Sequence, residues 1–242
     1  MLAESSWPLT SKVRVLRLAG PGAPWPPQDI SNDVNYVEST LADVEPTLPP
    51  KRQARSVARL RQILDESLAC FAEQGFERAT YDDLIRRSSV SRGSFYWYFP
   101  SKEALYDAVL DDCVDGYADR LEAQFAKTDP AEHVVRRLLA ASFTDFQANR
   151  ARYALLMRPP PSAAALAKMS GWNDDTLAFM RGKFEPLVAA DRLAAADAAI
   201  LPGVLSAFID GVCLRALLDI DGAIPELSGQ ISDLLCRIIP EA

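Results

Sequence analysis

The 242-residue chain contains a single histidine, His133, and its four cysteines lie far apart without a CxxC pair. Nucleophilic catalysis needs a histidine beside a Ser or Cys, and zinc sites need several closely spaced Cys or His ligands. We find neither pattern, and no paired carboxylates on facing helices. We therefore predict no enzyme activity, no catalytic residues, no metal and no cofactor, with His133 at the surface. The cysteines are interpreted as reduced, mostly buried thiols: Cys70, Cys113, Cys213 and Cys236.

Long apolar runs and targeting segments are also missing. No run of about 18 apolar residues is present, so we expect no membrane-spanning helix and no membrane partner. The first ten residues lack a positive segment followed by an apolar core, which argues against a secretory signal. No repeat, Gly-rich phosphate loop or period-two strand pattern is visible. We expect a cytoplasmic protein.

The net charge of −7 at first argues against a nucleic-acid partner, but the charge is unevenly distributed. Residues 51–103 carry ten basic and seven acidic side chains, whereas residues 1–50 and 104–242 are net acidic. Local sign matters more for phosphate binding than the total does. The middle segment is therefore the candidate for contact with DNA.

Residues 1–50 contain eight of the seventeen prolines and show no sustained helical period. We predict a flexible extension, in which the basic residues Lys12, Arg14 and Arg17 either contact DNA or remain solvated.

After this extension, apolar residues recur at helical spacing. The first amphipathic helix carries Val57, Leu60, Leu64, Leu68 and Phe71 and ends near Gly75, a predicted left-handed cap. Thr80, with Asp83 three residues later, is typical of the start of a second, short helix, and Ser91 of a third that ends at Pro100. A long helix then starts at Ser101, with a four-residue repeat at Leu105, Val109, Cys113, Tyr117, Leu121 and Phe125. Further helices are predicted at about 131–149, 151–157, 162–190, 195–219 and 225–239.

Two short helices joined by a tight turn, between a basic helix and a long one, are typical of a helix-turn-helix. The amino-terminal turn of the second short helix would enter the major groove. There, Arg92 can donate two hydrogen bonds to guanine, Ser94 can bond to several bases, and Gly93 permits close approach of the backbone.

Five consecutive aromatic residues, 95–99, follow this turn. Five such residues cannot all face inward on a helix, and we expect Phe95 and Phe99, four apart, to form the buried side. Tyr96 and Tyr98 carry hydroxyls suited to phosphate oxygens, and Lys102 adds a cation. The full predicted DNA-binding set is Thr80, Ser91, Arg92, Gly93, Ser94, Tyr96, Trp97, Tyr98 and Lys102. The basic residues of the first helix either contact flanking phosphates or form a solvated face: Lys51, Arg52, Arg55, Arg59 and Arg61.

Residues 53–110, about a quarter of the chain, resemble the DNA-binding domain of the tetracycline-repressor (TetR) family. The best-matching part is Val90-Ser91-Arg92-Gly93-Ser94-Phe95-Tyr96, followed by Phe99 and Ser101-Lys102-Glu103-Ala104-Leu105. The resemblance implies base contacts by Arg92, Gly93 and Ser94, and phosphate contacts by Thr80, Tyr96, Tyr98 and Lys102. Two positions depart from the family pattern: Ile85 replaces an alanine, and Ser89 replaces a turn glycine. Ser89 would then adopt a left-handed conformation at a cost of about 1 kcal/mol.

By the same resemblance, the rest of the chain is an effector-binding and dimerisation domain. Its apolar and aromatic composition favours a small hydrophobic or aromatic effector, although each large side chain can equally be ordinary core. The candidate effector-lining residues are Phe143, Phe146, Met157, Trp172, Phe179, Met180 and Phe208. The resemblance also implies that the last two helices pair with a second subunit, through Ile200, Val204, Phe208 and Val212 and through Leu227, Ile231, Leu234 and Ile238.

These observations predict an all-α protein: a flexible extension (1–50), a three-helix DNA-binding domain (51–103) and a larger helical effector and dimerisation domain (104–242). The leading hypothesis is a homodimeric repressor that binds a double-stranded operator and is released by its effector. Such a protein would associate with the bacterial nucleoid when bound to DNA. Effector binding would move the two recognition helices away from the spacing of one major-groove repeat, about 34–36 Å. A ligand-independent activator or architectural protein, and a helical enzyme or carrier, are the alternatives.

Overall fold

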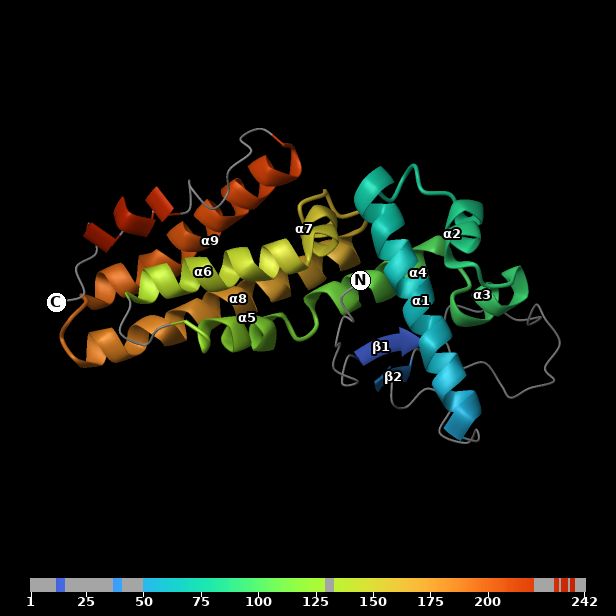
Figure 1. The fold of residues 1–242 in the computed structure, drawn as a ribbon, viewed down its shortest axis with the longest axis horizontal. Coiled ribbons are helices and arrows are strands. Elements are labelled where there is room, and N and C mark those ends of the chain that lie inside the picture. Colours follow the sequence, from blue (N-terminus) through green and yellow to red (C-terminus); the bar gives the residue numbers. More distant parts are fainter. Residues whose placement is uncertain are drawn as a thin grey trace. The chain divides into compact units, whose positions relative to one another are not determined.

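The computed structural model describes residues 12–15, 37–40, 50–128, 133–219, 229–230, 232–234 and 236–237. The chain divides into two compact units, Met1–Asp115 and Gly116–Ala242, which are considered separately below. From residue 50 onward, the regular elements of the described residues are helices, as the sequence predicts (Figure 1).

The first unit also contains two short antiparallel strands, β1 (Lys12–Val15) and β2 (Val37–Thr40), with Val13 opposite Ser39. The sequence analysis expected no strands and an irregular segment here. Four residues per strand are too few for an alternating pattern to be recognised against background.

Helix α1 (Pro50–Gln74) buries Leu60, Leu64, Leu68 and Phe71, as its apolar spacing predicts. Gly75 follows at φ 79°, and the ring of Phe76 packs back on Phe71 with 6.1 Å between centroids. Helix α1 packs against α2 (Tyr81–Ser88) and α4 (Lys102–Val114), and α3 (Arg92–Tyr98) completes the helical part of the unit. The helix-turn-helix elements therefore form where they were predicted.

The chain turns between these helices use the predicted capping residues. Ser101 accepts a hydrogen bond from the Ala104 amide, which starts α4. Ser89 adopts the left-handed conformation, φ 53° and ψ 23°, at the end of α2. Serine therefore occupies a left-handed turn position at which glycine would avoid steric strain.

The long helix predicted from Ser101 is interrupted. Helix α4 ends at Val114, Gly116 has φ 63°, and α5 (Tyr117–Phe125) begins at the next residue. All six residues of the predicted apolar repeat are nevertheless buried. The repeat identified the core-facing residues correctly, but a left-handed glycine can break a helix without disturbing that pattern.

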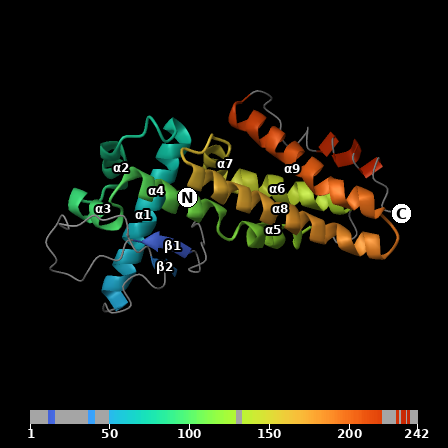
Figure 2. The same cartoon turned by 180° about the vertical axis from the view of Figure 1, so that it is seen from behind.

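Up to residue 219, the helices described in the second unit are α5, α6 (Val134–Ala148), α7 (Arg150–Leu156), α8 (Ala163–Ala189) and α9 (Ala195–Leu217). Helix α6 packs against α5, α7, α8 and α9, and the opposite view shows the same neighbours (Figure 2). The predicted ranges agree closely with these helices. Of the predicted final helix, residues 229–230, 232–234 and 236–237 are helical, and the rest of it lies outside the described residues.

Among the described helices, α9 is long and apolar enough to cross a membrane, judged by length and composition alone. The sequence analysis required an uninterrupted apolar run, which Asp197, Asp210 and Arg215 prevent. A core helix of a globular protein passes the same test, so one such helix is weak evidence for a membrane segment.

Candidate nucleic-acid interface

The amino-terminal turn of α3 lies at the surface. Ser91 caps it by accepting a hydrogen bond from the Ser94 amide at 3.3 Å, and the two hydroxyls are 2.9 Å apart. Arg92 and Gly93 are exposed, and Ser94 is half-buried. A Cβ atom added at Gly93 would meet no other atom within 4 Å. No packing inside the unit therefore requires glycine at this position.

Arg92 forms an ion pair that the sequence did not reveal. Its Nη2 atom donates to Oδ1 of Asp82, in the first turn of α2, at 2.5 Å. Both side chains remain largely in solvent, 62% and 72% exposed. The amino-terminal turns of α2 and α3 thus meet through the side chain predicted to contact a base.

The aromatic run divides into a buried and an exposed part. Phe95 and Phe99 are buried, as predicted, whereas Trp97 is 38% exposed and Tyr96 is half-buried. Tyr81 of α2 packs against both Phe95 and Tyr96, with ring centroids 5.3 and 4.9 Å apart. Its hydroxyl donates to the carbonyl of Phe99. These contacts fix the start of α2 against α3.

The predicted phosphate contact by Tyr98 is wrong. Its side chain is 3% exposed, and its hydroxyl donates to the backbone oxygen of Ser56 at 3.2 Å and lies 2.7 Å from the Ser56 hydroxyl. The reason is helical geometry: Tyr98 follows Phe95 by three residues and shares its inward face. Tyr98 ties α3 to α1.

Lys102 is also largely engaged within the protein. Its Nζ donates to the carbonyls of Phe76 and Ala79, at 2.9 and 3.2 Å, and lies 4.2 Å from the Phe76 ring centroid. An ammonium has three donors, so one remains for a phosphate oxygen. Its clearest role in this structure is to hold the loop between α1 and α2 against the start of α4.

Thr80 is exposed, and its hydroxyl caps α2. It accepts from the Asp83 amide at 3.1 Å and donates to the Asp83 carboxylate at 2.5 Å. This hydrogen bond, helped by nearby arginines, lowers the pKa of Asp83. Two carboxylates, Asp82 and Asp83, therefore occupy the turn where a phosphate was predicted to bind.

The basic residues of α1 separate into two groups. Arg55 and Arg59 are exposed on one face, four residues apart. Arg61 instead forms a two-bond ion pair with Asp112 of α4, at 2.8 and 3.1 Å, and the Asp112 side chain is 4% exposed. Arg61 is thus a structural residue. The side chains of Lys51 and Arg52 lie outside the described residues.

Sequence reasoning missed Asp82, Tyr81, Ser56 and Asp112. Each acts through a partner on another helix, 10 to 51 residues away along the chain. Only Tyr81 gave a signal, because an aromatic side chain in the first turn of a short helix is expected to pack on its neighbour.

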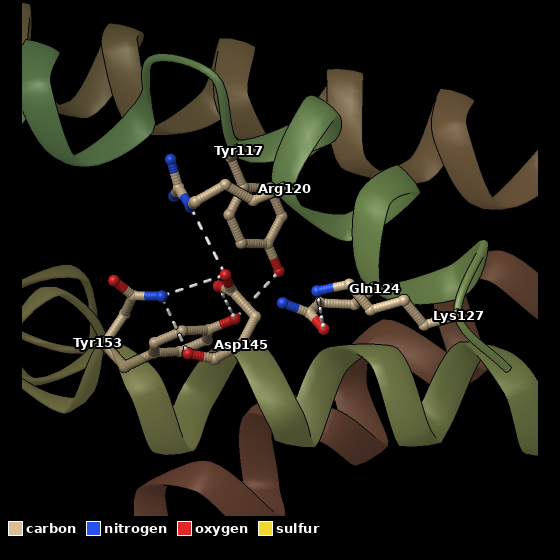
Figure 3. A network of polar contacts seen from close by, with 7 residues as sticks. Tyr117, Arg120, Gln124, Lys127, Asp145 and Tyr153 are labelled. Carbon is tan, nitrogen blue, oxygen red and sulfur yellow. Dashed lines mark hydrogen bonds and ion pairs between the residues drawn. The ribbon is translucent and has the colours of Figure 1, made fainter. Parts of the chain in front are cut away.

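The second unit contains a buried polar network (Figure 3). The Asp145 carboxylate of α6 accepts from the Tyr153 hydroxyl at 3.1 Å and the Asn149 side-chain amide at 3.0 Å. Nε of Arg120 lies 3.4 Å from it. The hydroxyls of Tyr117 and Tyr153 are 3.2 Å apart. Because Tyr153 donates to Asp145, Tyr117 is the donor between the two tyrosines.

Burial raises the pKa of both tyrosines, which keeps their hydroxyls protonated. Burial likewise raises the pKa of Cys213 to about 12. The network therefore combines neutral donors with the Arg120 cation around one carboxylate.

The predicted effector-lining residues all belong to one apolar cluster in this unit. Phe143, Phe146 and Met180 are buried in it. The partly buried members packed against it include Met157, Trp172, Phe179 and Phe208. The Trp172 ring packs edge-on against Tyr117 at 5.2 Å, and its buried indole N–H finds no acceptor among the described residues.

His133, predicted at the surface, is partly exposed at the start of α6, where its Nδ1 accepts from the Val135 amide. Of the four cysteines, three are buried and Cys236 is partly exposed, and none forms a disulfide.

Comparison with known proteins finds a family match within the first unit. The sequence profile described as "Bacterial regulatory proteins, tetR family" matches residues 63–109, from within α1 to within α4. The A-factor receptor protein of Streptomyces griseus is 39% identical over 61 residues, which are 25% of this chain and 22% of that protein. The HTH-type transcriptional repressor Rv1474c of Mycobacterium tuberculosis is 32% identical over 115 residues, 47% of this chain and 59% of that protein. The chain thus spans less than two thirds of either relative.

The fold extends beyond the matched sequence. The transcriptional regulator FadR from Bacillus subtilis, solved in complex with stearoyl-CoA, aligns with a TM-score of 0.62, covering 76% of this chain and 99% of that one at 16% identity. This likeness includes the helices of the second unit and concerns the fold alone. The tetR profile on residues 63–109, with regulators among the relatives, shows that the first unit carries the helix-turn-helix domain of the tetR family of bacterial regulatory proteins.

Proposed function

We propose that the chain is a sequence-specific DNA-binding transcriptional regulator that represses its target genes. The observation that supports this most strongly is the exposed first turn of α3, where Arg92 and Gly93 face solvent on a helix fixed from behind by Phe95 and Tyr98. Base edges are read by such a turn in the major groove. Candidates for phosphate contacts are the exposed Trp97, Arg55 and Arg59 and the half-buried Tyr96.

A gel-shift titration with DNA fragments flanking the gene, at several salt concentrations, tests this proposal. We expect preference for one fragment, and an affinity that falls steeply as salt increases, because phosphate contacts release counterions. Equal affinity for all fragments would contradict sequence-specific regulation.

The proposed DNA-binding form is a homodimer, because two-fold symmetry lets two short recognition helices bind one palindromic operator. Helix α9 offers the surface for it. Its exposed side carries Ile200, Val204, Ala207, Gly211 and Leu214 at alternating four- and three-residue spacing, and the exposed C-cap residue Leu218 continues the series. Ile200 is 63% and Val204 48% exposed. An exposed apolar stripe of this length is typical of a subunit interface.

Two residues predicted for this interface face the other way. Val212 is buried, and Phe208 is partly buried against Phe143, with ring centroids 6.5 Å apart. A strict four-residue step from Ile200 advances by about 40° per step around a 3.6-residue helix. Phe208 and Val212 have therefore rotated into the core. Of the predicted residues farther along, Leu234 is 47% exposed, and Leu227, Ile231 and Ile238 lie outside the described residues.

Sedimentation of the full-length chain tests the dimer. We expect the double substitution Ile200→Glu and Val204→Glu to convert a dimer into a monomer, since it places four charges in the interface. Ala199→Glu, an exposed position about 100° around the same helix, is the matched control and should leave the dimer intact. A wild-type monomer would contradict the proposal.

We further propose that a small hydrophobic or aromatic effector binds within the second unit and releases the DNA. The candidate residues converge on one cluster with the unsatisfied indole N–H of Trp172, and a buried donor without an acceptor is costly unless something satisfies it. Binding would shift the population towards a spacing of the recognition helices unsuited to the operator.

A thermal-shift screen of small apolar and aromatic compounds, followed by DNA-release assays, tests the effector. We expect the stabilising compounds to release DNA from the wild type and to lose this effect with Trp172→Phe. Stabilising compounds that leave DNA binding unchanged would contradict release by an effector.

A further inference from the structure

The ion pair between Asp82 and Arg92 is the contact that the proposed function does not explain. A carboxylate beside a DNA-binding surface repels phosphates, which works against affinity. It also contributes little to folding, because an exposed ion pair is weakened by water and salt. Asp82 is 72% exposed, and α2 already has Asp83 bound to its cap, Thr80.

The position of Asp82 is fixed by its neighbour. Tyr81 packs on Phe95 and Tyr96 and donates to the Phe99 carbonyl, so the first turn of α2 is anchored to α3 on the side next to Asp82. The carboxylate therefore lies beside the start of α3 because of the fold, and Arg92 reaches it with one of its two terminal nitrogens.

This arrangement leaves the arginine able to bind a base. The contact with Asp82 uses Nη2, and each terminal guanidinium nitrogen carries two hydrogens. Nη1 and the second hydrogen of Nη2 remain available for the two acceptors of a guanine edge. An arginine ordered before binding loses less conformational freedom on contact, and the nearby negative charge discourages it from turning to a phosphate instead.

We propose that Asp82 is a specificity-determining positioning residue, which orients Arg92 for base contact and so joins α2 and α3 into one recognition unit. This inference rests on the proposed function as a sequence-specific DNA-binding protein. Asp82 improves discrimination between sequences at the expense of general affinity for DNA.

Selection of binding sites from a random pool of duplex DNA, followed by sequencing, tests the inference with the full-length chain. The base pair at which Arg92→Ala abolishes preference is the position that Arg92 contacts. We expect Asp82→Ala to weaken preference at that position, and at its symmetry mate, by about three- to tenfold, a part of what one bidentate contact contributes. Affinity for non-specific DNA should stay the same or rise. Asp82→Glu should restore part of the preference.

Two comparisons separate positioning from a general charge effect. Glu103→Ala removes an exposed acid from the first turn of α4, and we expect it to change no base preference. In the double variant Asp82→Ala with Arg92→Ala, preferences should match those of Arg92→Ala alone. Thermal unfolding of each variant establishes that it is folded. Asp82→Asn, a smaller change than Asp82→Ala, is tested in the same selection.

The inference is overturned if Asp82→Ala leaves the preference at the base pair contacted by Arg92 unchanged, or weakens the preference at every base pair equally. The same holds if Asp82→Ala changes base preference as much in the Arg92→Ala background as in the wild type. It is also overturned, with sequence-specific binding intact, if Arg92→Ala changes no position of an enriched motif. If the wild type enriches no motif at all, the proposed function fails together with the inference.

Discussion

The two units of this chain distribute polar and apolar side chains in opposite ways. The first unit presents Arg92, Gly93 and Trp97 at the surface of α3 and packs Phe95 and Tyr98 beneath them. The second unit places tyrosines and a carboxylate in its interior and exposes aliphatic residues along α9. The outward polar groups of the first unit suit a charged and polar partner such as DNA. In the second unit, the outward aliphatic groups suit a second protein surface, and the inward polar groups suit a small molecule. The four predictions below test this contrast, from the largest effect to the smallest.

The two arginines Arg61 and Arg59 of α1 should behave in opposite ways. Arg61→Ala leaves the buried carboxylate of Asp112 without its two-bond partner, and we expect a loss of about 3 kcal/mol in the free energy of unfolding. Arg59→Ala should leave that free energy within about 0.5 kcal/mol and reduce the salt dependence of DNA binding. Denaturant unfolding and salt titrations measure both. A stable Arg61→Ala protein with weak DNA binding would place Arg61 in the interface.

Gly93 should separate folding from DNA binding. Gly93→Ala adds a Cβ in open space and raises helix propensity, so we expect stability to rise by up to about 1 kcal/mol. In the groove the added methyl meets the DNA, and affinity should fall by about tenfold, within the range for one disturbed base contact. Gly182→Ala, in open space on α8, is the control and should leave DNA affinity unchanged. Unchanged affinity for Gly93→Ala would show that α3 does not approach DNA closely at this residue.

The two tyrosines Tyr98 and Tyr96 provide a test within one helix. Tyr98→Phe removes the hydrogen bond to Ser56 and should lower the free energy of unfolding by about 1 kcal/mol, with little effect on the DNA complex. Tyr96→Phe should leave stability unchanged and weaken DNA binding. Calorimetry and titration distinguish the two, and a reversed pattern would contradict the assignment of inner and outer faces to α3.

Asp210 tests the interior of the second unit through pH. Burial raises its pKa, so the folded protein disfavours the charged form and stability is lost as pH rises above the unfolded-state pKa of about 3.9. Asp210→Asn should therefore be more stable than the wild type at pH 7, by about 1 kcal/mol or less, and the advantage should vanish towards pH 4. An advantage that is independent of pH would mean that desolvation of the charge is not its cause.

The sequence predicts local features of the fold better than contacts between helices, for a physical reason. Caps depend on residues three or four apart, so Thr80, Ser91 and Ser101 were identified from local spacing alone, whereas the left-handed turn at Ser89 was inferred from the family resemblance. The partners of Tyr98 and Arg61 lie 42 and 51 residues away, and local patterns carry no information about such contacts. In α9, the apolar residues were recognised, but a four-residue step drifts around the helix, and the exposed face was assigned partly to buried residues.

The central claim is that the first turn of α3 reads base edges. Selection from random duplex DNA by the wild type and by Arg92→Ala tests it most directly. We predict that the wild type enriches two inverted half-sites and that Arg92→Ala keeps the half-site spacing while losing preference at one base pair in each. Enrichment of the same bases by both proteins, or of none by the wild type, would contradict it.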